Sequence, residues 1–408
     1  MAAHGGGTRH GRRAVLALGG LLAASCALPA APADTAARDV RRLLDRRAAA
    51  LLARDRAAFL AVLAPEAPGL RSAQGEEFDH LAGVPLTEWH YRLTGLDRTG
   101  DGTVTARVEL RHRVAGYDAT PAVSARRVDL RRRDGQWHVT GDRPAHGGTR
   151  ELWQQGPVAV ARGRRCVVLG TGHGAERLRR IAETADAAVD AVARAWTRES
   201  DLRTVLLVPS SLSAMGALLG EPAAGYRGIA AVTTGASEGG RRTSADRVIV
   251  NPEAYEVLGA VGRQVVLTHE TTHVATRTAT TAATPMWLSE GFADWVAYRD
   301  SDRTPAQIAP ELRRTVRREG LPDALPADGD FRFAGDADRL AGAYEGGWLA
   351  CRMIVERTDE ATLLALYESV GAHPRREGAV TAALRRHLDT TPEEFTARWR
   401  AYVRDALA

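Results

Sequence analysis

Two histidines four residues apart, His269 and His273, constrain this chain more than any other feature of its sequence. On a helix they lie only about 40° apart on one face, one turn above the other. Two imidazoles arranged in this way can both reach one metal ion about 2 Å away, which is the ligand distance of zinc. The apolar run over 265–267 indicates that the helix is buried and would hold both rings rigidly. Glu270 would point into the same cleft as a general base for a metal-bound water.

The pattern HETTH alone is a weak signal, because a chain of this length contains it by chance on the order of a few times in a hundred. The simpler interpretation is a polar helix face that happens to carry two histidines. A second segment, WLSEGFA, favours the metal site. Pro285 is placed to start a helix there, so Glu290 can supply a carboxylate ligand and leave a fourth position open for water. Asp294, one turn further along, could accept the other ring N–H of His269 and fix its tautomer.

A third segment, AYEGGW, places a tyrosine ahead of an apolar helical run. Together the three segments resemble the gluzincin zinc peptidases: thermolysin, the aminopeptidases and especially the small bacterial peptidase-MA-like domains. HETTH matches HExxH, WLSEGFADW matches the W-L-x-E-G-x-A block, and AYEGGWLA is similar to the later Y-E-x-x-W helix. The resemblance covers roughly residues 155–405. It departs in one respect, since the sixteen residues between His273 and Glu290 are slightly fewer than in thermolysin or the large aminopeptidases.

The resemblance implies one zinc ion per chain, held by His269, His273 and Glu290, and hydrolysis of a peptide bond by a zinc-bound water. It implies that Glu270 takes the proton from that water and passes it to the leaving amine. Tyr344 would donate a hydrogen bond to the oxyanion, although a tyrosine that only packs two helices explains this position equally well. A Gly-x-Met-x-Asn-type block, with which the large aminopeptidases hold a free amino terminus, is absent ahead of HETTH, and this favours an endopeptidase.

In gluzincins the strand before the active helix is an edge strand that pairs with an extended substrate through backbone hydrogen bonds. By resemblance, 247–250 would be that strand, with Val248 and Val250 as substrate-binding residues. The expected partner is a peptide or protein substrate, and the sequence indicates no partner protein. Two rival functions remain open. One is a catalytically weak lipoprotein that keeps zinc for stability and binds substrate or acts as a scaffold. The other is a nucleotide-binding protein built on the glycine-rich turn at 170–175, although no acidic residue follows the next strand to bind a ribose.

Residues 1–33 have the pattern of an export signal rather than of folded structure. Three arginines within 9–13 form a positive region, and 14–24 is an apolar stretch far too short to span a membrane. Cleavage is expected after Ala33, or before Cys26 if the protein is a lipoprotein. We therefore expect an extracytoplasmic protein, either secreted or attached to the cell envelope through a lipidated Cys26. The sequence leaves the export route open.

The basic character of the chain does not indicate a nucleic-acid partner. All 55 basic residues are arginine, which is typical of a GC-rich genome. The leader carries three arginines and no acidic residue, so its removal lowers the formal net charge from +5 to +2. No basic face with interleaved aromatic residues is present, and such a face is the usual footprint of nucleic-acid binding.

The length of the mature chain predicts two domains of the α+β class. The first, residues 35–150, is expected to contain a helix over 36–63 followed by an antiparallel sheet, an order that resembles the ketosteroid-isomerase-like fold without a motif to support it. The second, residues 155–408, is expected to combine a mixed sheet, the active helix and a helical carboxyl-terminal part. Cys166 and Cys351 either form a disulfide or are two small buried residues.

Overall fold

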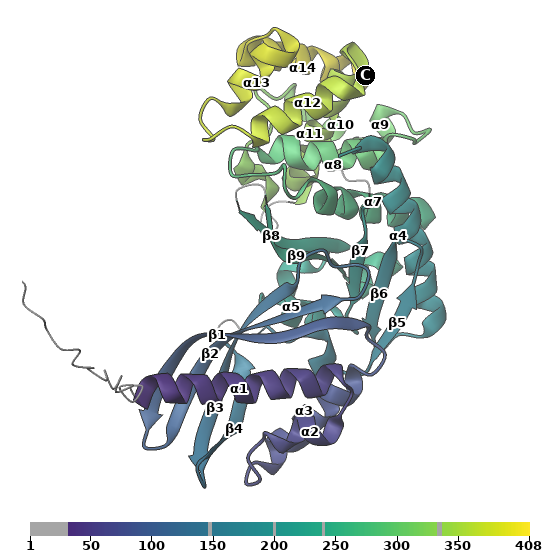
Figure 1. The fold of residues 1–408 in the computed structure, drawn as a ribbon. Coiled ribbons are helices and arrows are strands. Elements are labelled where there is room, and N and C mark those ends of the chain that lie inside the picture. Colours follow the sequence, from purple (N-terminus) through teal and green to yellow (C-terminus); the bar gives the residue numbers. More distant parts are fainter. Residues whose placement is uncertain (1–31, 146–148, 199–200, 239–240, 333–336) are drawn as a thin grey trace, which may run out of the picture.

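The computed structural model describes most of the chain, and Figure 1 shows its elements from the amino to the carboxyl end. The described residues are 32–145, 149–198, 201–238, 241–332 and 337–408. The leader is expected over residues 1–33; residues 1–31, including Cys26, lie outside the described part, whereas helix α1 already begins at Pro32, so the expectation that the whole of 1–33 is not folded is wrong at its last two residues. Among the described helices, none is both long enough and apolar enough to cross a membrane. The protein is α+β, with one antiparallel sheet, one mixed sheet and a helical carboxyl-terminal part.

The amino-terminal domain packs three helices against an antiparallel sheet with the strand order β1-β2-β3-β4. Its elements are α1 (Pro32–Leu52), α2 (Arg56–Ala61), α3 (Pro68–His80), β1 (Leu86–Gly100), β2 (Thr103–Val114), β3 (Ala122–Arg133) and β4 (Gln136–Pro144). Every second residue of β2 is buried, in agreement with the alternation of apolar and polar residues along it. Figure 1 shows α1 lying across this sheet.

The predicted single helix over 36–63 is wrong. The chain leaves α1 at Leu52, and Arg54 has a φ of 57°, a left-handed conformation that interrupts a right-handed helix. Asp55 then starts α2 by accepting a hydrogen bond from the backbone N–H of Ala58 at 2.9 Å. Leucines follow helical spacing on both sides of this turn, so hydrophobic periodicity alone does not reveal it.

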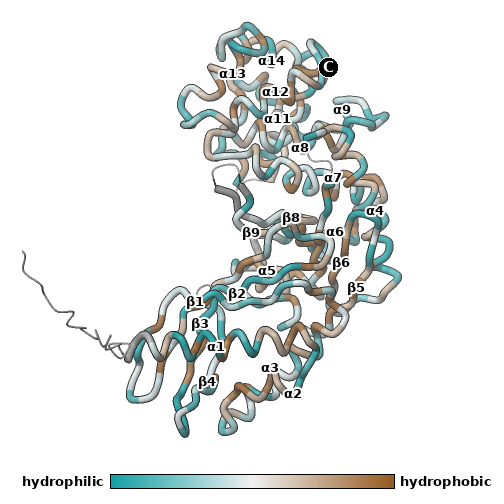
Figure 2. The backbone as a smooth tube through the Cα atoms, in the orientation of Figure 1, coloured by the Kyte–Doolittle hydropathy of each residue, from teal (hydrophilic) through white to brown (hydrophobic). Residues whose placement is uncertain are grey.

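The second sheet is mixed and has the strand order β5-β6-β7-β9-β8. Its strands are β5 (Val158–Arg162), β6 (Cys166–Thr171), β7 (Thr204–Val208), β8 (Ala231–Glu238) and β9 (Arg241–Val250). One face packs beneath α4 (Ala175–Ala195) and α7 (Ala260–Thr276), and the other face joins the core of the amino-terminal domain. Figure 2 shows β6 coloured hydrophobic along most of its length, whereas α4 carries long hydrophilic stretches, because the strand is interior and the helix borders solvent.

The segment 247–250, expected to be the substrate-binding strand, is part of β9, but the expectation that it forms an edge of the sheet is wrong. β9 pairs with β7 on one side and with β8 on the other, so its backbone is not free to pair with a substrate. Val248 and Val250 are buried in the core below α4 and α7. They therefore cannot be the substrate-binding residues. The strand that ends the sheet on this side is β8.

The remaining predictions for the sheet region agree with the structure. The glycine-rich segment 170–175 is the connection between β6 and α4, and Gly172 has the positive φ of 73° that such a tight turn requires. Cys166 and Cys351 are both buried free thiols, so no disulfide joins them. Two short helices, α5 (Leu212–Leu219) and α6 (Pro252–Glu256), complete this part of the chain.

The chain after residue 285 is helical and forms the green-to-yellow lobe in Figure 1. Its helices are α8 (Met286–Tyr298), α9 (Pro305–Ile308), α10 (Pro310–Glu319), α11 (Ala337–Arg357), α12 (Glu360–Gly371), α13 (Ala379–Leu388) and α14 (Pro392–Ala406). Helix α14 begins with a capping box. Thr391 Oγ1 accepts the Glu394 N–H at 3.2 Å, and Glu394 Oε2 accepts the Thr391 N–H at 3.1 Å.

Helices α8 and α11 cross in backbone contact at two glycines. A Cβ atom added to Gly291 would lie 2.3 Å from the carbonyl oxygen of Gly347, and one added to Gly347 would lie 2.7 Å from the carbonyl oxygen of Trp287. Both distances are shorter than any tolerated contact, so only glycine fits at this crossing. The glycines of the WLSEGFA and AYEGGW segments therefore have a packing role, and they set the distance between the helices that carry Glu290 and Tyr344.

We expect Gly291→Ala to destabilise the protein by about 1–3 kcal/mol or more, because the new methyl group meets backbone that cannot move aside. Urea unfolding followed by circular dichroism measures this. The matched control is Gly342→Ala, inside the partner helix α11, where an added Cβ meets nothing within 4 Å. This second change should stabilise the helix by roughly 0.5–1 kcal/mol. Equal effects of the two substitutions would show that the crossing is not close-packed.

Candidate metal centre

Helix α7 holds both histidines on a largely buried stretch that also contains four buried threonines. Thr272 Oγ1 donates to the carbonyl oxygen of Thr268 at 2.8 Å, and Thr276 Oγ1 donates to that of Thr272 at 3.0 Å. Hydroxyl groups that bond one turn back along their own helix need no other partner. The helix can therefore lie between the sheet and α8 with few unsatisfied polar groups, and its imidazoles are the polar groups turned toward α8.

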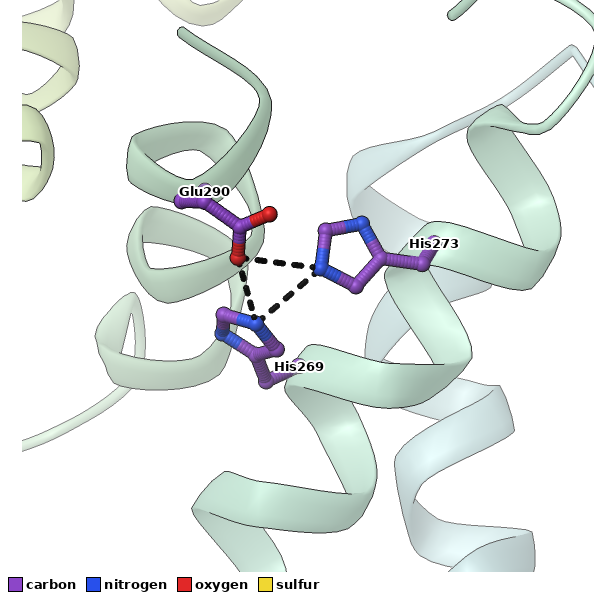
Figure 3. Close-up of side chains that lie close together, drawn as sticks. All are labelled: His269, His273 and Glu290. Carbon is purple, nitrogen blue, oxygen red and sulfur yellow. Dashed lines mark hydrogen bonds and ion pairs between the residues drawn. The ribbon is translucent and has the colours of Figure 1, made fainter. Parts of the chain in front are cut away.

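Helix α8 begins directly after Pro285, as predicted, and presents Glu290 to α7. In Figure 3 the two imidazoles and the carboxylate point toward a common centre. The Nε2 atoms of His269 and His273 are 3.0 Å apart. Glu290 Oε2 lies 3.1 Å from the former and 3.3 Å from the latter. The structure thus brings together the three residues that the sequence proposes as metal ligands.

These separations suit a single metal ion. Three atoms bound at about 2.0–2.1 Å in a tetrahedral site lie about 3.3 Å from one another. Asp294 Oδ1 is 2.7 Å from His269 Nδ1, so the proton of a neutral imidazole resides there and the lone pair of Nε2 faces the centre. Lone pairs of three atoms that face one another repel unless a cation lies among them. The group of His269, His273 and Glu290 could therefore bind a metal ion.

The pKa shifts of His269 and Glu290 also indicate that positive charge is favoured at this centre. Burial lowers the pKa of His269, but the carboxylates of Asp294 and Glu290 outweigh this effect and raise it well above its usual value. Burial raises the pKa of Glu290, but His273 and His269 outweigh this effect and lower it below its usual range. Glu290 thus stays ionised although its side chain is buried, and a cation at the centre would complete its charge balance.

The centre opens into a cleft of about 840 Å³ between β8, α7, α8 and α11. Glu270 lines this cleft beside the three metal-ligand candidates. Its Oε2 accepts a hydrogen bond of 2.6 Å from Thr233 Oγ1, whose hydroxyl also lies 3.1 Å from the carbonyl oxygen of Glu270. One hydroxyl proton serves one acceptor at a time, and the shorter contact is to the carboxylate. Thr233 therefore fixes the direction of the Glu270 side chain.

Tyr344 also lines the cleft, on α11. Its ring centroid is 6.0 Å from that of His269 and 5.2 Å from that of Phe331. Burial, followed by the negative charges of Glu290, Asp294 and Glu270, raises the pKa of Tyr344 well above its usual value. The phenol is therefore protonated at neutral pH and able to donate a hydrogen bond into the cleft.

Neighbouring Glu345 has a structural part in the same wall. Its carboxylate accepts the backbone N–H groups of Glu311 and Leu312, at 3.2 and 2.5 Å, and so caps the first turn of α10. Burial raises the pKa of Glu345 to about 7, against the opposing effect of these two hydrogen bonds. The Glu345 carboxylate therefore serves as a helix cap and is not needed as a metal ligand.

Strand β8 contributes residues to the cleft, and the sequence alone does not indicate this. Residues 231–233 line the cleft, whereas Val248 and Val250 do not. Nothing in the local sequence of β8 indicates that this strand ends the sheet. The pairing partners of a strand depend on the order in which distant segments assemble, and one segment does not encode that order.

Comparisons with known proteins identify no family. No protein-family model matches the chain, and no curated protein matches it. Among solved structures, a Mycobacterium tuberculosis protein of unknown function aligns with 28% of this chain and 75% of its own, at 17% identity and a TM-score of 0.24. A similarity at this TM-score carries no argument about fold or function.

We expect the purified protein to contain one divalent metal ion per chain, and His269→Ala, His273→Ala and Glu290→Ala each to lose it. Asp294→Asn keeps all three ligands but weakens the hold on the His269 ring, so metal affinity should fall by roughly 10- to 100-fold. Plasma mass spectrometry after dialysis against a graded chelator measures both effects. His373→Ala, a histidine remote from the cleft, is the control that should retain the ion. Metal content that survives all three alanine substitutions would rule out this centre.

Proposed function

We propose that this protein is an exported zinc-dependent peptidase of the gluzincin type. The observation that carries the proposal is the convergence of His269, His273 and Glu290 at 3.0–3.3 Å in a cleft that also contains Glu270. Two imidazoles and one carboxylate are a donor set typical of catalytic zinc, because they leave a fourth position for water or substrate. A zinc site that only supports the fold usually has four protein ligands.

In the proposed mechanism His269, His273 and Glu290 would hold the metal, and Asp294 orients the His269 ring. Zinc bound there would polarise the substrate carbonyl and lower the pKa of a water ligand toward neutrality. Glu270 accepts the proton of the attacking water and returns it to the leaving amine. Thr233 keeps the Glu270 carboxylate in position for this transfer. Tyr344 donates a hydrogen bond to the oxygen on which negative charge develops.

We further propose β8 as the strand that binds the substrate. It is the last strand on its side of the sheet, and three of its residues, 231–233, line the cleft. An extended peptide placed along β8 could therefore add a strand and pass the metal centre. The assignment replaces Val248 and Val250, whose strand has no free side. Because Thr233 lies on β8 and contacts Glu270, the same strand would align both the substrate and the base.

The competing function is a zinc-containing protein that binds substrate or acts as a scaffold without efficient catalysis. A substitution of Glu270 distinguishes the two functions, because this residue is not a proposed metal ligand in either of them. Glu270→Gln keeps the size and the polarity of the side chain but cannot accept a proton at neutral pH. We expect hydrolysis of a peptide library to fall by about 10²- to 10⁴-fold, with zinc content and melting temperature nearly unchanged.

The matched control for this test is Glu183→Gln, at an exposed position of α4, which should have no effect on hydrolysis. A Glu270→Gln variant as active as the unmodified protein would contradict the mechanism. If the zinc-loaded unmodified protein cleaves no peptide and the substitution changes nothing measurable, the scaffold function replaces the peptidase.

Export is the second part of the proposal and is supported by the leader pattern in the sequence. Mass spectrometry of the native amino terminus tests it. A first residue of Asp34 indicates a secreted protein, and a diacylglyceryl group on Cys26 indicates a lipoprotein held at the membrane. Detection of an intact Met1 in the native protein would contradict export.

A further inference from the structure

A second large cavity lies where the two domains meet, away from the metal centre. Its volume is about 510 Å³, within the range of roughly 300–1,000 Å³ that is usual for small-molecule sites. Residues from β2, β3 and the 149–153 segment line one side of it, and residues from α5 and the second sheet line the other. Figure 1 shows α5 and the strands of the first sheet next to one another at this join.

The cavity is part of a tightly fixed joint rather than a gap between loosely placed domains. Arg247 on β9 forms a bidentate ion pair with Asp118, at 2.7 and 2.8 Å, across the domain boundary. The backbone N–H of Ala245 donates to the carbonyl oxygen of Pro121 at 3.1 Å beside it. Val167 and Leu169 of the second sheet belong to the same buried cluster as the amino-terminal core. Such a joint keeps the cavity open without a ligand, as preformed binding sites require.

The cavity is distinct from the interior of the amino-terminal domain, which is filled. Asp142 there accepts hydrogen bonds from Arg47 at 3.0 Å and from Arg126 at 2.7 Å, and all three side chains are buried. The hollow beside this cluster measures only about 10 Å³. Trp153 separates the two spaces, since it borders both. A ligand of ordinary size therefore fits the joint and not the inner domain.

The walls of the cavity are mostly aliphatic, and two polar atoms among them, His112 Nδ1 and Ser124 Oγ, are buried without a hydrogen-bond partner within the described residues. The aliphatic residues are Val84, Leu86, Val114, Leu152, Val158, Leu169, Leu207, Leu218, Leu219 and Ile249. His112 is only 6% exposed and makes no hydrogen bond with any described residue. Its ring packs edge-on against Trp153, with centroids 5.1 Å apart. A buried polar group left in this state costs about 1–3 kcal/mol, which a ligand group that bonds to it would recover.

Three charged side chains border the cavity, Arg150, Glu151 and Arg247; of these, Arg150 is exposed and donates to the carbonyl oxygen of Gln154 at 2.6 Å. Burial, with a further contribution from Arg247, lowers the pKa of His112 to about 3, so its imidazole is neutral. The Arg247 guanidinium is already bound to Asp118 and has no need of an anion. Glu151 lines the same space, and burial raises the pKa of its carboxyl, which makes it a weak partner for an ammonium group. A carboxylate or an ammonium group would have to give up its hydration for walls that are mostly aliphatic, which is costly for either charge. A hydroxyl group, which both donates and accepts, matches a neutral imidazole.

We propose that this cavity is a second binding site, for an uncharged amphipathic molecule whose apolar body contacts the aliphatic walls and whose hydroxyl group hydrogen-bonds His112. The inference is independent of the proposed peptidase activity, because no residue of the metal centre lines the cavity.

Three probes that share one chain and differ in the head group test the proposal: decan-1-ol, decanoate and decylammonium. Titration calorimetry on the mature protein should show saturable binding of one decan-1-ol per chain, accompanied by a change in tryptophan fluorescence from Trp153. Decanoate and decylammonium should bind at least about tenfold more weakly, since each would bury an unpaired charge. Absence of saturable decan-1-ol binding, or equal affinity for all three probes, would overturn the proposal.

Two variants locate the site. His112→Leu should weaken decan-1-ol binding by about three- to tenfold, the effect of one lost neutral hydrogen bond, and His90→Leu, an exposed histidine on β1, should not change it. Leu218→Trp fills the cavity from α5 and should abolish binding even if His112→Leu does not fold. Unchanged binding in Leu218→Trp would overturn the assignment. Binding by Glu270→Gln at full affinity is expected and separates this inference from the peptidase proposal.

Discussion

The carboxyl-terminal half is arranged around one group of side chains, His269, His273 and Glu290, that could bind a metal ion. Two imidazole nitrogens and a carboxylate oxygen meet within 3.3 Å, with their lone pairs directed at one another. Such a group is unfavourable in a buried place unless positive charge is shared among its members. The buried helix α7, the hydrogen bond from His269 to Asp294 and the close crossing of α8 with α11 all serve to hold these atoms together. The fold therefore holds His269, His273 and Glu290 in an arrangement that could bind a metal ion.

Strand β8 connects the two cavities of the molecule. Residues 231–233 line the cleft of the metal centre, whereas Thr234 and Gly235 line the cavity at the domain joint. The strand changes its register with β9 between Thr234 and Ala236, and Gly235 has a φ of 155° at this bulge. A bulge re-aims neighbouring side chains, so consecutive residues of one strand can border two different spaces. Because β8 is the last strand on this side of the sheet, its residues can border both spaces.

The sequence predicts the three candidate metal ligands well, because each of them lies in a short motif on one helix. HETTH fixes two ligands on one helix turn, and Pro285 with the WLSEGFA segment fixes the helix of the third. The order of strands is not local, and this is why β9 was expected at the edge that β8 occupies. The break of the first helix at Arg54 depends on one backbone angle that a regular leucine pattern conceals. The cavity beside His112 requires two domains to pack, and no single segment contains that information.

Glu270 carries the argument for chemistry rather than for structural support at this centre. The glycines near Glu290 and Tyr344 are explained by the crossing of two helices, so those segments would be needed by an inert protein as well. Glu270 has no such role. It is buried, forms no ion pair within the described residues, and is held by one threonine hydroxyl. A buried carboxylate without a cationic partner reduces stability. The hydrogen bond from Thr233 offsets only part of this loss, and action on a substrate or its water, the role that the proposed mechanism assigns to Glu270, would explain why the carboxylate is placed there.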